Sequence, residues 1–249
     1  MILATTLFII TYLLMLTLPK YRSKVVLLSA SLFIVLGYAG FFPLDFPSAL
    51  RAVDYNVLLM IGGTMGIVTL FIESKMPLRL AEILITKVPN IQLAVTALAL
   101  FAGVISAFVD NVATVLMVAP IWLAISRKLR ISPVPVLIAI AVSSNLQGAA
   151  TLVGDTTSIL LGGFAQMSFF DFFWMQGKPG IFWAVELGAL ASMFILLFLF
   201  RKEKTRITAH VETHVEDGFP TLLLIMTVLL LIVASFLPLP TNPIFAVLY

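Results

Sequence analysis

Five stretches of the chain are almost entirely apolar and are each about as long as a bilayer is thick. A membrane-spanning helix needs about 17–25 such residues at a rise of 1.5 Å per residue. The stretches are Ile2–Leu18, Val25–Phe42, Asn56–Ile72, Gly180–Phe200 and Pro220–Leu237. Two longer apolar stretches, Ile91–Ser126 and Pro133–Gln176, are interrupted by polar residues. The sequence therefore predicts an all-α polytopic membrane protein whose first partner is the lipid bilayer.

The composition excludes several other classes of protein. Only 11% of the residues are charged, whereas soluble domains are about one-quarter charged. The chain has no cysteine, which rules out disulfides and thiolate metal sites. Its net charge of +3 does not indicate a nucleic-acid partner, because the basic residues lie in short loops beside apolar stretches. The first stretch is not a signal peptide, since its basic residues follow the apolar core.

The positions of lysine and arginine predict an orientation. We place the N-terminus outside, let each plain stretch and Pro133–Gln176 cross once, and let Ile91–Ser126 return to its starting side. Cytoplasmic loops then hold 13 of the 15 basic residues, namely Lys20, Arg22, Lys24, Lys75, Arg79, Lys87, Arg127, Lys128, Arg130, Arg201, Lys202, Lys204 and Arg206. Only Arg51 and Lys178 fall outside. This distribution follows the positive-inside rule and predicts a multi-pass protein of the cytoplasmic membrane.

The same count limits how the two interrupted stretches cross. If Pro133–Gln176 crossed twice, the basic cluster Arg201–Arg206 would move outside and the bias would collapse. This stretch is therefore predicted to cross once, as a discontinuous helix. Ile91–Ser126 returns to its starting side either as a re-entrant hairpin or as two full spans, and the charge count does not distinguish the two.

We expect three regions along the chain. Residues 1–200 form a first transmembrane repeat with the hairpin at 91–126 and the broken helix at 133–176, residues 201–219 a cytoplasmic linker, and residues 220–249 the start of a truncated second repeat. Five crossings plus a hairpin would start the second repeat on the opposite side, as in inverted-repeat transporters. The linker holds both histidines, and its alternative role is that of a pH sensor. Glu73–Asn90 is predicted to be an interfacial amphipathic helix, or else an ordinary charged loop.

Two polar constellations interrupt the long apolar stretches. The first runs Ser106-Ala-Phe-Val-Asp110-Asn111-Val-Ala-Thr114. The second runs from Ser143 to Ser158 and includes Ser144, Asn145, Gly148, Thr151, Gly154, Asp155 and Thr156. Glycine lets the backbone unwind, and hydroxyl and amide groups replace the lost backbone partners. Irregular backbone at membrane depth survives only where it is buried in protein or lines a cavity. We therefore expect two helix breaks that approach each other.

Neither aspartate of these constellations has a lysine or arginine in its own stretch. A charged aspartate at the centre of a membrane helix costs about 2.5–3.5 kcal/mol on insertion scales. The counter-charge of Asp110 and Asp155 is then a proton, a metal cation, the N–H groups of a helix N-terminus or a residue elsewhere. In the alternative interpretation both aspartates only cap helices, although a half-helix N-terminus is itself an ion-binding element.

The two constellations resemble signatures of the ion transporter superfamily, in particular the group of arsenite permeases, NhaD-type sodium/proton antiporters and the P protein. Dicarboxylate/sodium symporters and citrate transporters are similar at a greater distance. The resemblance covers Asn56–Phe200 and implies two inverted repeats, each with a re-entrant hairpin and a broken helix that bind ion and substrate at their tips.

The resemblance also implies roles for individual residues. Asp110, Asn111 and Thr114 would form the hairpin tip, and sodium is a candidate ion at Asp110, Asn111 and Asp155. The unwound part of the broken helix would comprise Ser144, Asn145, Gly148, Thr151, Gly154 and Asp155, with Thr156 beside it. The group usually has two prolines and an asparagine after the Gly-Asp pair, where this chain has Thr156, Thr157 and Ser158. The substitution offers more hydroxyl ligands.

These observations favour a secondary active ion transporter, coupled to a cation or a proton, that needs no cofactor and is not an enzyme. Its partners would be a small inorganic or organic ion and a second copy of the chain in a homodimer. The main alternative is a carrier of an anion, arsenite or a dicarboxylate. Two distant alternatives are a membrane scaffold and an intramembrane aspartyl protease, whose Gly-x-Gly-Asp signature is broken here by Leu152.

Overall fold

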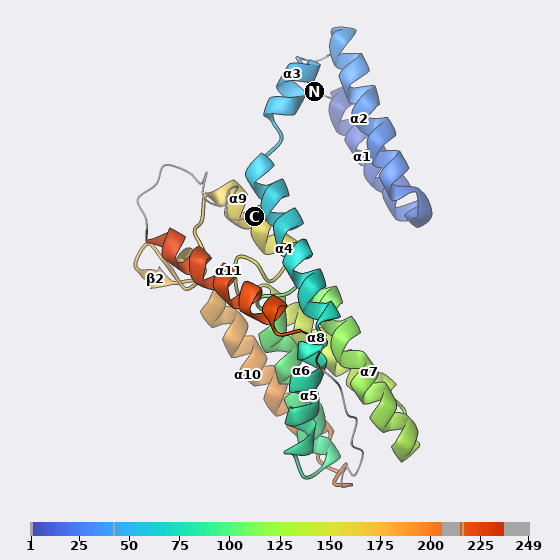
Figure 1. The fold of residues 1–249 in the computed structure, drawn as a ribbon. Helices are drawn as coiled ribbons and strands as arrows, with labels where there is room; N and C mark the ends of the chain where they lie inside the picture. The colour runs from blue at the N-terminus through green and yellow to red at the C-terminus, as the bar shows by residue number, and fades with distance from the viewer. Residues whose placement is uncertain (1, 42, 206–214, 216, 237–249) are drawn as a thin grey trace. The chain divides into compact units, whose positions relative to one another are not determined.

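The computed structural model describes residues 2–41, 43–205, 215 and 217–236. The two histidines, most of the expected linker and residues 237–249 lie outside the described residues, so the predictions about them stay predictions. The chain divides into two compact units, Met1–Asp54 and Tyr55–Tyr249, and each is described here by itself (Figure 1).

The first unit is a pair of apolar helices followed by a short helix. It consists of α1 (Ile2–Thr17), the 3-10 turn Pro19–Tyr21, α2 (Arg22–Tyr38) and α3 (Phe46–Arg51). Helices α1 and α2 pack together, and Thr11 Oγ1 donates a hydrogen bond to Ser29 Oγ over 2.9 Å. Asp45 caps α3, because its Oδ1 accepts from the Ser48 N–H at 2.9 Å. Most side chains of α1 and α2 are exposed, as expected of helices that face lipid.

The second unit is built around three tightly packed helices. Its elements are α4 (Tyr55–Glu73), α5 (Met76–Thr86), α6 (Ile91–Ser106), α7 (Asn111–Leu129), α8 (Val134–Gly148), α9 (Thr156–Ala165), a 3-10 turn at Phe170–Phe172, β1 (Trp174–Met175), β2 (Lys178–Pro179), α10 (Ile181–Leu199) and α11 (Phe219–Ser235). Helices α6, α7 and α8 pack against one another, α10 covers α6 and α8, and α4 contacts α9 and α11 (Figure 1). Their core includes Val95, Leu98, Trp122, Ile125 and Ile140.

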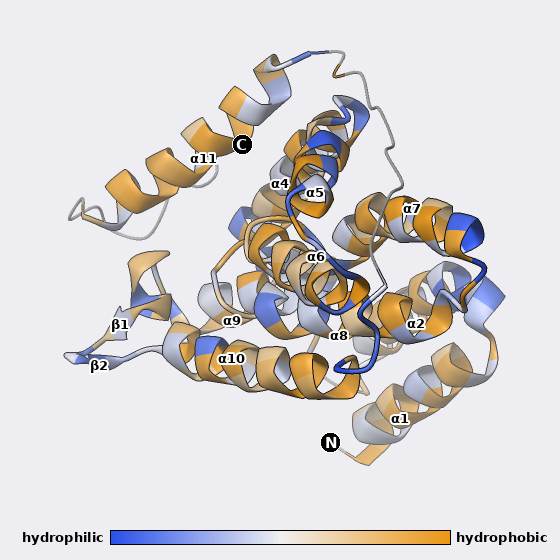
Figure 2. Ribbon diagram, turned by 90° about the horizontal axis from the view of Figure 1, so that it is seen from below, coloured by the Kyte–Doolittle hydropathy of each residue, from blue (hydrophilic) through white to orange (hydrophobic). Residues whose placement is uncertain are grey.

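Four helical segments among the described residues are long and apolar enough to cross a membrane. They are Pro19–Tyr38, Tyr55–Glu73, Asn111–Leu129 and Ile181–Leu199. The predicted spans at the start and end of the chain form shorter apolar helices, Ile2–Thr17 and Phe219–Ser235. Hydrophobic residues, coloured orange, predominate along the helices (Figure 2), and many of their large apolar side chains are exposed. The chain is therefore a mostly helical, multi-pass membrane protein, as the sequence predicted.

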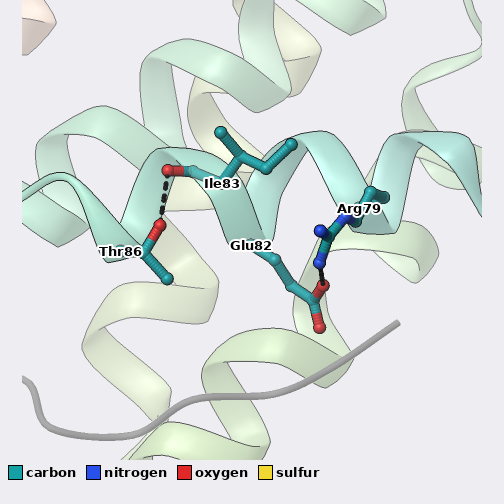
Figure 3. Close-up of polar contacts among 4 residues, drawn as sticks. All are labelled: Arg79, Glu82, Ile83 and Thr86. Carbon is teal, nitrogen blue, oxygen red and sulfur yellow. Dashed lines mark hydrogen bonds and ion pairs between the residues drawn. The ribbon is translucent and has the colours of Figure 1, made fainter. Parts of the chain in front are cut away.

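The segment predicted to be an interfacial helix is a helix, α5, but its acidic side chain does not face outward. Glu82 is 4% exposed, and its Oε2 lies 3.3 Å from Arg79 Nη1 in an ion pair (Figure 3). Two apolar residues of the same helix, Leu80 and Ile83, are exposed. α5 packs against α6 and α7, so one face of the helix is part of the protein core.

Candidate functional site

The first predicted break is present but shorter than the sequence suggested. Helix α6 ends at Ser106 and α7 begins at Asn111, so only the four residues between them are non-helical and Asn111–Thr114 is the first turn of α7. Asp110 is the N-cap of α7, and its Oδ2 accepts from the Ala113 N–H at 3.0 Å. Thr114 Oγ1 donates to the Asp110 carbonyl at 3.0 Å. Capping by Asp110 is therefore a structural fact, whatever else its carboxylate does.

The second break separates α8, which ends at Gly148, from α9, which begins at Thr156. It too is shorter than predicted, because Ser144 and Asn145 lie in the last turns of α8. Asp155 is the N-cap of α9 by position, yet its side chain makes no capping hydrogen bond. Its carboxylate instead accepts from Thr157 Oγ1 at 2.8 Å and from Thr156 Oγ1 at 3.3 Å. The two aspartates thus have different surroundings.

The broken-helix stretch also ends earlier than predicted. Helix α9 stops at Ala165, with Gln166 in the left-handed conformation after it. The remaining residues up to Gln176 form a 3-10 turn and a strand of the β1–β2 hairpin. The run from Phe169 to Trp174 is aromatic except for Asp171, and aromatic residues occur in membrane helices as well as in strands, which is why the sequence did not reveal this change.

The two breaks lie directly against each other, as the sequence predicted. Asn111 Nδ2 donates to Asn145 Oδ1 at 2.6 Å, and Ser144 Oγ donates to the Asn111 carbonyl at 3.0 Å. On the other side, Thr151 Oγ1 donates to the Ala107 carbonyl. These bonds connect the start of α7 to α8, and the end of α6 to the second break. Of the three, the Thr151 hydroxyl satisfies a backbone carbonyl of the first break itself, from 44 positions further along the chain.

Gly154 packs closely against both helix ends that flank the breaks. A Cβ at this position would lie 2.5 Å from the Gly148 carbonyl oxygen and 2.6 Å and 2.7 Å from those of Ser106 and Ala107. Only glycine fits without moving backbone. Three carbonyl oxygens at the C-terminal ends of α6 and α8 therefore converge on the second break, beside the N-terminus of α9.

The electrostatics of this junction come mainly from helix ends. The N-termini of α7 and α9 carry partial positive charge, and the C-termini of α6 and α8 carry partial negative charge. Ser106 Oγ is buried and has no hydrogen-bond partner among the described residues. The described residues contain no cluster of three or more His, Cys, Asp or Glu. A cation held here would therefore take hydroxyl, amide and carbonyl oxygens in addition to a carboxylate, a ligand set suited to hard cations.

Some features of the junction were not foreseen from the sequence. The Ala107 carbonyl is part of the junction because it accepts a hydrogen bond from the Thr151 hydroxyl. Gln147 is buried, and its amide lies so close to Gly103 that a Cβ there would be 2.4 Å from Nε2. Glycine within an otherwise apolar helix is a weak signal of such close packing, but nothing in the sequence said which residue it faces.

Apolar helices of spanning length, with two paired helix breaks in the helical core, define a polytopic helical membrane protein. The sequence profile described as "Citrate transporter" matches residues 11–249. The chain belongs to this family, which is a branch of the ion transporter superfamily. The resemblance that the two motifs carried is thereby confirmed.

Individual relatives agree with this assignment. An uncharacterized transporter of Mycobacterium tuberculosis (strain H37Rv) is 30% identical over 172 residues, which are 69% of this chain and 40% of the relative. A "46 kDa membrane protein" of Mycobacterium leprae is 48% identical over 67 residues, 27% of this chain and 16% of the relative. The human P protein is 30% identical over 116 residues, 44% of this chain and 13% of the relative.

The matches cover only part of each relative. The chain spans about 40% of the length of the Mycobacterium tuberculosis transporter. No solved structure matches the chain. The family is thus shown by sequence, and the geometry of the junction comes from the structure of this chain alone.

Proposed function

We propose that the chain forms part of a secondary active ion transporter in which a cation or a proton is bound where the two helix breaks meet. The observation that carries the proposal is the contact between the breaks. The hydrogen bond from Asn111 Nδ2 to Asn145 Oδ1 joins two half-helix ends whose surroundings are rich in oxygen ligands. No lysine or arginine occurs between Lys87 and Arg127 or between Arg130 and Lys178, so neither stretch brings a competing positive side chain of its own to a bound cation.

The proposed ion-binding region includes the polar residues of both breaks. They are Asp110, Asn111, Thr114, Ser144, Asn145, Gly148, Thr151, Gly154, Asp155 and Thr156. Within this set Asp155 is the favoured ion ligand, because its carboxylate is not used to cap α9 and two threonine hydroxyls already orient it. The Asp110 carboxylate accepts one capping hydrogen bond, and a carboxylate has further lone pairs that can bind an ion. Sodium is the proposed metal ion at Asp110, Asn111 and Asp155.

An anion is the second candidate for the transported species. The N-termini of α7 and α9 favour negative charge, and discontinuous helices in transporters direct such termini at anionic substrates. The family's printed description is that of a citrate transporter. In this version a tricarboxylate or dicarboxylate, or arsenite, would be carried, and the cation would supply the driving force.

The proposal extends to the architecture. We propose an N-terminus outside, a cytoplasmic linker, inverted repeats and a homodimer, with transport by alternating access and without covalent chemistry. Helix α7 has the length and apolarity of a full span, which fits the alternative of two full spans. Helix α6 has only 16 residues, which fits the alternative of a re-entrant hairpin. Lys204→Cys and Lys178→Cys, labelled from outside with an impermeant maleimide, test the orientation. We expect only the second to react.

The experiment on function uses the full-length protein in proteoliposomes. Uptake of labelled sodium, citrate and arsenite is measured under imposed sodium and pH gradients, for the unaltered protein and for Asp155→Asn. We expect one gradient to drive uptake and the variant to lose most of it. Asp45→Asn is the matched control, because Asp45 is an exposed N-cap in the first unit. Equal uptake by Asp155→Asn and the unaltered protein would refute the ion site.

A further inference from the structure

Aromatic residues crowd the segment Ser168–Trp183, which connects α9 to α10. They are Phe169, Phe170, Phe172, Phe173, Trp174, Phe182 and Trp183. Two of the three tryptophans of the chain are among them. None of these side chains is among the polar residues of the helix breaks, so their concentration needs a separate physical reason.

The segment forms a short β-hairpin with a tight turn. Trp174 pairs with Pro179 and Met175 with Lys178 in antiparallel register. The turn residues Gln176 and Gly177 both have positive φ, at 52° and 77°, the pattern of a type I′ turn that matches the twist of the two strands. The hairpin projects from the helical body of the second unit (Figure 2).

Hydrogen bonds fix the base of the hairpin. The Gly180 N–H donates to the Phe173 carbonyl at 2.8 Å, and Trp183 Nε1 donates to the same oxygen at 3.2 Å. The carboxylate of Asp171 accepts from the Ser168 N–H and hydroxyl, both at 2.7 Å. The negative charge is therefore held in the loop, and Lys178 is left as the exposed charge near the turn.

The aromatic side chains divide into a buried set and an exposed set. Phe169 and Phe172 are 2% and 0% exposed and pack in one cluster with Leu152 and Val153 of the second helix break. Trp174 and Trp183 are both 46% exposed, and their rings lie 6.2 Å apart between centroids. One end of the hairpin region is thus fixed to the break, while both tryptophan side chains remain about half exposed.

The position of the hairpin along the chain determines what can cover the indoles. It immediately precedes α10, whose 19 residues extend about 28 Å at 1.5 Å per residue, close to the roughly 30 Å thickness of the hydrocarbon core. The beginning of such a helix lies at the membrane surface. Tryptophan is enriched at that level because its ring is apolar and its N–H is polar, and a lysine side chain near a helix end reaches toward the headgroups.

We propose that the hairpin Trp174–Pro179, together with Trp183, is an anchor that binds the headgroup layer of the bilayer. Trp174 and Trp183 insert at the boundary between headgroups and acyl chains, and Lys178 contacts lipid phosphate. Since Phe169 and Phe172 connect the same segment to Leu152 and Val153, the anchor fixes the depth of the second helix break in the membrane.

The test measures the depth of the hairpin directly. A spin label is attached at Gln176→Cys in the full-length protein, with any cysteines outside these 249 residues replaced, in vesicles of phosphatidylcholine and phosphatidylglycerol. Collision rates with oxygen and with a water-soluble nickel chelate report depth. Leu190→Cys, at an exposed site along α10, is the control. We expect the Leu190 label to meet oxygen almost exclusively, and the Gln176 label to meet both reagents at rates typical of the headgroup level.

A second variant tests the role of the indole. Trp174→Ala is expected to shift the Gln176 label toward water, with more collisions with the chelate and fewer with oxygen. Phe164→Ala, which removes a 92% exposed aromatic ring from α9, is expected to leave the label in place. The proposal is overturned if the Gln176 label behaves as if in bulk water, if neither reagent reaches it because protein covers it, or if Trp174→Ala changes nothing.

Discussion

Asn111 and Asn145 join the start of α7 to the last turns of α8 through one hydrogen bond, from Nδ2 to Oδ1 at 2.6 Å, although 34 positions separate them in the chain. Asn145 Nδ2 in turn donates to the Ala141 carbonyl at 2.9 Å, which holds its oxygen toward Asn111. The pair is a direct hydrogen bond between two side chains of the helix ends that flank the breaks.

We therefore expect Asn111→Ala and Asn145→Ala to affect the same interaction. Each should lower the free energy of unfolding by about 0.5–1.5 kcal/mol, and the double variant should cost less than the two single costs combined. Thermal unfolding of the four proteins in detergent measures the coupling. If the two losses of unfolding free energy simply add, the two side chains do not interact energetically.

Gly154→Ala is expected to be strongly destabilising and to abolish transport. The new Cβ would meet three carbonyl oxygens at 2.5–2.7 Å, and forced displacement in a packed core typically costs about 1–3 kcal/mol. Gly66→Ala is the control, because no atom lies within 4 Å of a Cβ there, so this helical position should tolerate alanine or gain stability from it. Similar unfolding temperatures for both variants would show that the breaks are not closely packed.

Two substitutions of Asp110 separate its capping role from its charge. Asparagine caps helices about as well as aspartate, whereas alanine costs roughly 0.5–2 kcal/mol. Asp110→Asn should therefore unfold near the temperature of the unaltered protein, and Asp110→Ala at a lower one. If the carboxylate binds the ion, both variants lose transport in proteoliposomes. Full transport by Asp110→Asn would leave only the cap.

The buried carboxylate of α5 gives a prediction about stability. Glu82 is almost fully buried, whereas the side chain of its partner Arg79 is 44% exposed. A charge-assisted hydrogen bond contributes about 1.5–3 kcal/mol, and solvent screening at Arg79 should reduce this contribution. Glu82→Ala should lower the unfolding temperature clearly, while Glu73→Ala, at an exposed site, should change it little. A small effect of salt on the Glu82 variant, compared with the unaltered protein, would support the pair.

Acid should weaken the start of α3. Hydrogen bonds from the Ser48 hydroxyl and the Ser48 N–H hold the pKa of Asp45 below its usual value. Because this pKa is lower in the folded chain than in the unfolded chain, the ionised carboxylate stabilises the fold at pH values above the unfolded pKa of about 3.9. That contribution is lost as the pH falls through the folded pKa. The Ser48 amide resonance should titrate below about pH 3.9 in micelles, and Asp45→Asn should abolish that titration.

The sequence alone predicted the membrane class, the positions of the main helices and the existence of both breaks. It could do so because these depend on the length of apolar runs and on local residues that unwind or cap helices. Asp110 begins a helix as an N-cap residue should, and α10 lies within one residue at each end of its predicted span. The superfamily followed from the two polar motifs, since these were long enough to be specific.

The tertiary structure decided which groups of the two breaks face each other. The contact of Thr151 with the Ala107 carbonyl, the fit of Gly154 among three carbonyl oxygens and the inward turn of Glu82 all depend on how α6, α7 and α8 pack. The same is true of the aromatic hairpin, whose residues read as a continuation of a membrane helix until a left-handed Gln166 and a tight turn redirect the chain. Local preference sets where a helix stops, but only packing between distant segments sets what lies opposite its end.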